Sequence, residues 1–137
     1  MNEGEARTYA LLVYVSAGDT MLSDELMTLN ARGLDLLRKV LARPLPEAAV
    51  PLDLFAGHDS LPAFWLAREK EGWFLGVFNW EEDPAVLRVD LPTLGIDPAA
   101  SITTFWDGKP VRPRDGAIAL ELAPRASEGF RIAAPRR

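Results

Sequence analysis

The sequence predicts an α+β fold that is mainly β: a short N-terminal helical segment over residues 1–43, followed by an antiparallel β-sandwich over residues 44–137. Three observations support this prediction. A dense run of large apolar residues occupies 73–80, several short apolar segments separated by turn residues surround it, and a segment with helical periodicity precedes residue 43. The chain of 137 residues is long enough to bury the core of one ordinary domain.

The run Trp73–Trp80 is predicted to be the central strand. Aromatic and β-branched side chains suit strands, and successive side chains alternate between the two faces of a sheet. The residues predicted to face one way are Trp73, Leu75 and Val77, and those predicted to face the other way are Phe74, Phe78 and Trp80. Because both faces are apolar, we expect this strand to be covered on two sides.

Residues 3–15 change from polar to apolar, and their composition allows either a helix or a strand. Thr20–Leu22 is predicted to be a short strand-like piece. Asn30 is a suitable N-cap for a helix over Ala31–Ala42, whose leucines recur at spacings of three and four, and Pro44 ends this helix.

The remaining strands are predicted along residues 50–133. In order, the segments are Leu52–Phe55, Ala63–Arg68, Val86–Leu91, Ser101–Trp106, Gly116–Leu122 and Gly129–Ala133. A short loop joins the second segment to the central strand as a hairpin, and Asp107–Gly108 marks another hairpin turn. Short strands with frequent turns indicate a sandwich or a barrel.

The composition excludes several classes of function. The net charge is −5 and no basic patch is present, which argues against a nucleic-acid surface. The chain has no Cys, so disulfides and thiolate metal sites are excluded. No apolar run reaches membrane-spanning length, and no signal-peptide pattern occurs. We therefore expect a soluble, cytoplasmic protein with no cofactor, no nucleic-acid partner and no membrane partner.

Few residues of the sequence are candidates for a catalytic or metal-binding role. His58 is the only histidine, and we interpret it as a solvated loop residue. The cluster Glu81–Asp83 lacks the spaced ligands of a cation site, so we interpret it as an exposed polar turn. Asp24 and Glu25 could be carboxylates at the mouth of a barrel, or acids that stabilise the first turn of the next segment. The residues alone favour the role in the first turn.

The tryptophans suggest a sugar-binding platform, because sugar rings stack their C–H faces on indole. The four are Trp65, Trp73, Trp80 and Trp106. Three of them lie in segments dense in apolar residues and are expected to pack in the core. Trp106, beside the Asp107–Gly108 turn, is expected to be the most exposed. No phosphate-binding loop, nucleophile elbow or zinc-ligand spacing occurs, so the residues alone show no active site.

The chain carries a series of short motifs in a fixed order. They are Leu22–Leu26, Leu34–Leu41, Pro51–Phe55, Gly76–Trp80, Leu94–Gly95 and Phe105–Gly108. This series resembles the C-terminal part of bacterial α-galactosidase-type glycoside hydrolases, the melibiases and their relatives, which include raffinose synthases. The likeness extends from about Glu5 to Ile132, and the turn Pro124–Ser127 departs from it, because the family usually has a His-containing turn there.

The resemblance implies a (β/α)8 barrel followed by a C-terminal antiparallel β-sandwich. Glu5–Val15 would be the helix before the eighth barrel strand, Thr20–Ser23 that strand, and Ala31–Ala42 the closing helix. The family's two catalytic aspartates lie on earlier barrel strands, so they have no counterpart here. Retaining glycosidases need two carboxyls about 5 Å apart, and no such pair maps onto this chain. The substrate-binding candidates are Asp24, at the rim of the barrel face, and Trp106.

We therefore expect the non-catalytic C-terminal region of a retaining α-galactosidase-like glycoside hydrolase, a fragment whose sandwich packs on the catalytic barrel of the parent enzyme. One alternative is a free-standing carbohydrate-binding β-sandwich that uses Trp106 or Trp65. Another is a small homo-oligomeric scaffold joined through the apolar N-terminal segment. We also expect residues 44–137 to fold without residues 1–43.

Overall fold

A computed structural model describes residues 2–17, 26–42, 47–56 and 61–135. The helical elements are α1 (Glu3–Ser16), α2 (Ala31–Ala42) and two 3-10 turns, η1 (Leu26–Thr28) and η2 (Pro92–Leu94). The strands are β1 (Val50–Pro51), β2 (Phe64–Glu69), β3 (Gly72–Phe78), β4 (Ala85–Asp90), β5 (Ser101–Thr104), β6 (Pro110–Val111), β7 (Ala117–Leu122) and β8 (Ser127–Ala133). The predicted class, α+β and mainly β, is confirmed.

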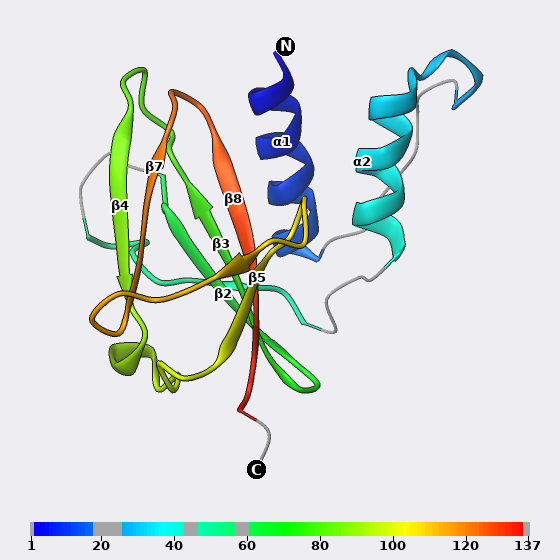
Figure 1. Ribbon diagram of the computed structural model, residues 1–137. Coiled ribbons are helices and arrows are strands. Elements are labelled where there is room, and N and C mark those ends of the chain that lie inside the picture. The colour runs from blue at the N-terminus through cyan, green and yellow to red at the C-terminus, as the bar shows by residue number, and fades with distance from the viewer. Residues whose placement is uncertain (1, 18–25, 43–46, 57–60, 136–137) are drawn as a thin grey trace.

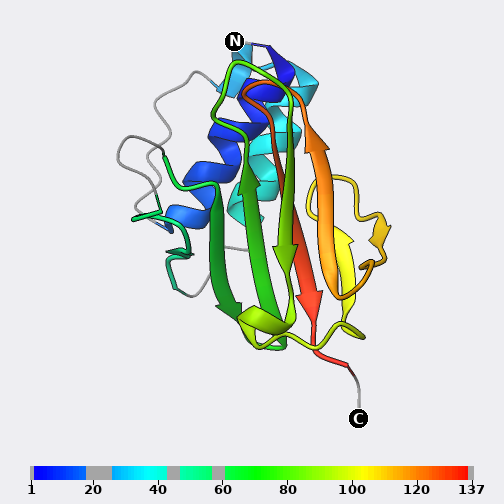
Figure 2. The same ribbon diagram turned by 90° about the vertical axis from the view of Figure 1, so that its left-hand side faces the viewer.

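The strands form two antiparallel sheets (Figure 1). The larger has the order β1-β2-β3-β8-β5-β6, and the smaller is the pair β4-β7. The smaller sheet lies over one face of the larger one (Figure 2). One apolar cluster joins them, in which Leu75 of β3 and Ile132 of β8 pack with Ile118 of β7. Burial of these side chains is what holds the two sheets together.

Strand β3 is the centre of the larger sheet, as predicted. It pairs with β2 on one side and β8 on the other. Leu75 and Val77 belong to the cluster between the sheets, whereas Phe74 and Phe78 belong to a second cluster on the opposite face. All four are fully buried. The predicted alternation of the two faces is therefore confirmed.

Helix α1 covers the second face of the larger sheet (Figure 1). Asn2 begins the helix with a capping box: its side chain accepts from the Glu5 N–H at 2.9 Å, and the Glu5 carboxylate accepts from the Asn2 N–H at 2.8 Å. Leu11 and Val15 are fully buried and lie in one cluster with the phenylalanines of β3. Of the two structures that the composition allows over residues 3–15, the chain adopts the helix.

The contacts of α1 bear on the division of the chain at residue 43, which stays a prediction. Thr8 donates to the Arg125 carbonyl at 2.9 Å, and the Arg131 guanidinium donates to the Tyr14 hydroxyl at 2.9 Å. With Leu11 and Val15 buried against β3, removal of residues 1–43 would uncover one whole face of the central strand. This packing favours the opposite prediction, that residues 44–137 need α1 to fold.

Helix α2 has the predicted bounds. Asn30 accepts from the Gly33 N–H at 2.8 Å, as an N-cap does. The helix lies on α1, away from the sheets, and Leu36 joins the cluster beneath α1 (Figure 1). No helix in the described part of the chain combines the length and apolar character that a membrane crossing requires.

One predicted strand is wrong. Leu52–Phe55 is a bend and turn that follows the two-residue strand β1. The Asp53 carboxylate accepts from the N–H groups of Ala63 (2.9 Å) and Phe64 (3.1 Å), so the segment folds back on the start of β2 and does not extend. The predicted strand over Thr20–Ser23 lies outside the described residues.

Candidate functional site

Asn79 organises the end of the sheet where β3 stops. Its side chain is 2% exposed, although it sits in an otherwise apolar run. The amide nitrogen is within hydrogen-bonding distance of three carbonyl oxygens, those of Asp83 (2.8 Å), Leu122 (3.2 Å) and Ala123 (3.0 Å). The amide oxygen accepts from the Glu81 N–H at 3.0 Å. One side chain thus fixes both the turn after β3 and the turn after β7.

Trp80 follows Asn79 and is held in a defined plane. Its ring stacks on Phe78, with centroids 4.9 Å apart and planes 2° from parallel. Its Nε1 donates to the Pro62 carbonyl at 2.8 Å. Because Phe78 is fully buried and Trp80 is only half-buried, Phe78 covers one indole face from the core side. A flat apolar surface of this kind is available for a ligand on its other side.

Arg125 occupies a strained place in the turn between β7 and β8. The Ala126 N–H donates to the Ala123 carbonyl at 3.1 Å, with Pro124 second and Arg125 third in the turn. Arg125 has a φ of 57°, a left-handed conformation that such turns normally give to Gly. For a residue with a side chain this costs about 1–2 kcal/mol.

Two contacts hold the Arg125 backbone in this conformation. Its N–H donates to the Glu81 carbonyl at 3.2 Å, and its carbonyl accepts from Thr8 Oγ1 of α1 at 2.9 Å. The guanidinium pairs with the Glu82 carboxylate, and this hydrogen bond and charge raise the pKa of Arg125. The side chain is therefore a permanent cation fixed beside a carboxylate.

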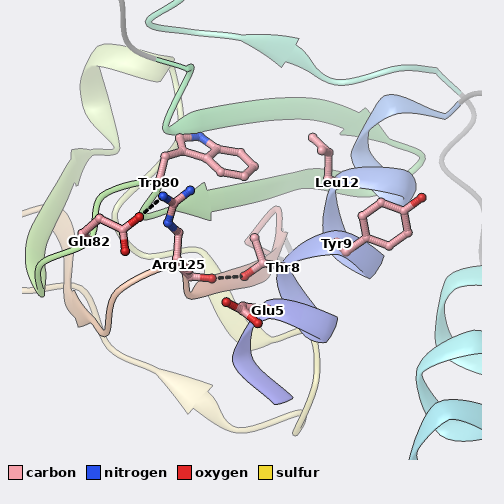
Figure 3. A pocket seen from close by; sticks show the side chains of 7 residues that line it. All are labelled: Glu5, Thr8, Tyr9, Leu12, Trp80, Glu82 and Arg125. Atoms are coloured by element: carbon pink, nitrogen blue, oxygen red, sulfur yellow. Dashed lines mark hydrogen bonds and ion pairs between the residues drawn. The ribbon is translucent and has the colours of Figure 1, made fainter. Parts of the chain in front are cut away.

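These elements border an open hollow of about 420 Å³ between α1 and the two turns (Figure 3). Its lining consists of Glu5, Thr8, Tyr9 and Leu12 from α1, and Trp80, Glu82 and Arg125 from the sheet side. In Figure 3 the indole of Trp80 extends toward Leu12, with the Arg125 guanidinium next to it. The hollow thus joins an aromatic wall to a guanidinium, two carboxylates and two hydroxyls.

The chemistry of this hollow is that of binding. The Glu5 carboxylate caps α1 and the Glu82 carboxylate pairs with Arg125, so each is already engaged. No group of acidic or histidine side chains suited to a metal ion occurs among the described residues. The lining contains no nucleophile paired with a general base, which covalent catalysis needs.

Glu128, which lies outside the hollow, has a carboxyl pKa that is shifted by its surroundings. Glu128 lies on β8 opposite Val77 of β3. Burial raises the pKa of the Glu128 carboxyl, and a hydrogen bond from the Gly129 N–H at 3.0 Å opposes that rise. This carboxyl is outside the hollow, and its titration concerns stability.

The residues singled out from the sequence have different outcomes. Asp24 and His58 lie outside the described residues. The cluster Glu81–Asp83 is an exposed turn, as interpreted. The expectation that Trp106 is the most exposed tryptophan is wrong: it is 3% exposed and packs against Phe105, with ring centroids 4.7 Å apart. Trp106 is buried in one cluster with Leu11 and Tyr14 of α1, and Lys39 of α2 donates to its carbonyl.

Sequence reasoning singled out Trp80 and the Glu81–Asp83 cluster, which contribute to the lining of the hollow, but it missed the residues that hold the hollow together. Asn79 left a signal, since a lone amide inside a run of large apolar residues indicates a buried polar group with partners. Arg125 left a weaker signal: it follows Pro in a turn, at a position where Gly or Asn is usual. Thr8 left none, because its partner is 117 residues away in the sequence.

No protein-family model and no curated protein matches this sequence. Solved structures do match. The GH27 β-L-arabinopyranosidase of Geobacillus stearothermophilus has a TM-score of 0.81 at 23% identity, over 98% of this chain and 31% of that one. The fold is that of part of a GH27-type glycoside hydrolase.

Two further enzymes extend this likeness. α-Galactosidase I from Mortierella vinacea has a TM-score of 0.71 at 10% identity, over 98% of this chain and 38% of that one. The isomalto-dextranase of Arthrobacter globiformis T6 has a TM-score of 0.72 at 18% identity, over 100% of this chain and 25% of that one. The chain therefore spans about a third of the length of the GH27-type structures it matches, and the resemblance found in the sequence is confirmed as a shared fold.

Proposed function

We propose that this chain is a non-catalytic, accessory region of an α-galactosidase-like glycoside hydrolase, in which it packs on the catalytic barrel. One observation carries the proposal. Of the nine large apolar side chains exposed among the described residues, all but Val86 precede β2. We call seven of these eight the N-terminal apolar surface and leave out Tyr9, which lines the hollow; the seven are Met27, Leu41, Val50, Leu52, Leu54, Phe55 and Leu61.

The asymmetry between the two parts of the chain has a physical meaning. Phe55 and Met27 are 94% and 95% exposed, whereas Val86 is the one large apolar side chain among the described residues from β2 onward that is exposed. Clustered exposed apolar side chains indicate a surface that another protein covers. In each matched enzyme about two thirds of the length lies outside the part that this chain covers, which supplies a partner of the right kind.

The engagement of both carboxylates of the hollow supports the accessory role. Retaining glycosidases need a nucleophile and an acid/base carboxyl about 5 Å apart. The two carboxylates that line the hollow are held by the α1 cap and by Arg125. We propose that the parent enzyme supplies the catalytic carboxyls from its barrel, and that it acts in the cytoplasm.

Light scattering on the purified chain tests the proposal. We expect concentration-dependent, open-ended self-association through the N-terminal apolar surface. The double change Leu52→Asp with Phe55→Asp is expected to suppress it. Val86→Asp is the matched control, because Val86 is 74% exposed but lies on β4, outside that surface, and it should leave association unchanged. A monomer at every concentration would contradict the proposal.

The same experiment separates the second candidate, a homo-oligomeric scaffold, which the apolar surface also suits. That candidate requires a dimer or other oligomer of fixed mass, and such a species would count against packing on a barrel. A chromogenic α-galactoside completes the test. We expect no turnover by the chain, and turnover would refute its non-catalytic role.

A further inference from the structure

We propose that the hollow between α1 and the Trp80 and Arg125 turns binds a neutral carbohydrate, with a pyranose ring against the free side of the Trp80 indole. This site goes beyond the packing role and does not depend on it. The sequence offered all four tryptophans as possible sugar platforms, with Trp80 expected in the core; the structure leaves Trp80 half-buried on the lining of the hollow. Trp106 is buried, and Trp65 does not line the hollow.

The first support is the fixed orientation of Trp80. Its stack on Phe78 and its hydrogen bond to Pro62 hold the indole in one plane before any ligand arrives. A rigid aromatic wall loses little conformational freedom on binding. The C–H face of a sugar ring is flat and apolar, and it matches such a wall.

The second support is the position of Arg125. The turn would be relaxed with Gly at a φ of 57°, yet it carries a long cationic side chain that lines the hollow. Backbone strain at a residue whose side chain lines a cavity points to a use for that side chain. The ion pair with Glu82 sets N–H donors beside carboxylate acceptors, and neighbouring sugar hydroxyls both donate and accept.

The third support is the balance of charge. The lining holds two carboxylates, Glu5 and Glu82, and one guanidinium, that of Arg125. The carboxylates repel an anion, and a cation would have to displace the contacts that already hold both carboxylates, Arg125 at Glu82 and the Asn2 N–H at Glu5. A neutral ligand rich in hydroxyls meets neither penalty. The volume of about 420 Å³ falls in the usual range for ligand pockets, about 300–1,000 Å³.

The test follows the tryptophan indole N–H signals of the full chain by ¹⁵N-correlated NMR, with methyl α-D-galactopyranoside and isomaltose as the probes. We expect a saturable shift of the Trp80 signal in the millimolar range with at least one probe. Trp80→Phe identifies that signal and is expected to weaken binding several-fold. Trp65→Phe is the matched control, since Trp65 also donates to the Pro62 carbonyl, at 3.1 Å, from outside the hollow.

Arg125→Gly separates binding from folding. Gly relaxes the left-handed turn, so the melting temperature should hold or rise while affinity falls at least tenfold. Unchanged affinity in this variant would overturn the proposal, as would the absence of a saturable Trp80 shift in the wild type. Glucuronate and methylamine serve as charged probes, and tighter binding of either would refute the assignment to a neutral sugar.

Discussion

Replacing Asn79 by Ala should unfold the end of the sheet more than any other polar substitution in the described part of the chain. The change removes two donated N–H bonds shared among three carbonyls, and one bond accepted from Glu81. At about 0.5–1.5 kcal/mol for each of three bonds, the loss is about 3 kcal/mol. For a chain of this length, that lowers the melting temperature by about 10 °C.

Urea unfolding followed by circular dichroism measures this loss. Asn30→Ala is the matched control, because it removes an exposed N-cap at the periphery and should cost about 1 kcal/mol. Asn79→Asp keeps the shape of the side chain but places a carboxylate oxygen against three carbonyl oxygens. This variant should therefore have a lower free energy of unfolding at neutral pH, and that free energy should rise again as the carboxyl is protonated. If Asn79→Ala unfolds within about 0.5 kcal/mol of the wild type, Asn79 does not hold the two turns together.

Three further changes test the packing. Phe78→Ala should lower the free energy of unfolding in urea by about 3–5 kcal/mol, because Phe78 is fully buried. Phe55→Ala is the control and should change that free energy little, because the Phe55 side chain is 94% exposed. Equal effects of the two changes would mean that the core is misplaced. Burial raises the pKa of Glu128, so the folded protein favours the protonated carboxyl. The stability that this group contributes is therefore present below the ordinary carboxyl pKa, and it is lost as the pH rises through the raised pKa of the folded state. Glu128→Gln should therefore melt higher than the wild type at about pH 8 and equally at about pH 4, and a uniform shift would refute this cause. Deletion of residues 1–43 should abolish cooperative unfolding, and a sharp melt of the remainder would show that α1 is dispensable.

The sequence was most informative where a signal is local. The density of aromatic residues in 73–80 identified the central strand and both of its faces, and Asn30 with the leucine spacing identified α2. Other features depend on partners far along the chain. Residues 3–15 were ambiguous because the surface that makes them a helix, the Phe74 and Phe78 face of β3, lies about sixty residues later.

The errors have the same origin. Trp106 stands beside a turn, which suggests exposure, but it is buried in one cluster with residues of α1, far away in the sequence. The segment Leu52–Phe55 has strand-like residues, but the Asp53 carboxylate bends it toward β2. The hollow required three separate segments to meet, and among the residues that hold them only Asn79 and, more weakly, Arg125 left a signal in the local sequence.

The size of the native species that contains this chain tests the central proposal most directly. Antibodies raised against the chain would be used to detect it in extracts of its source, by denaturing electrophoresis and by native gel filtration with an α-glycosidase assay. We predict either one polypeptide about three times the 15.1 kDa of this chain, or a complex of that size, carrying the activity. A free 15.1 kDa species with no associated polypeptide or activity would contradict the proposal that the chain packs on a catalytic barrel.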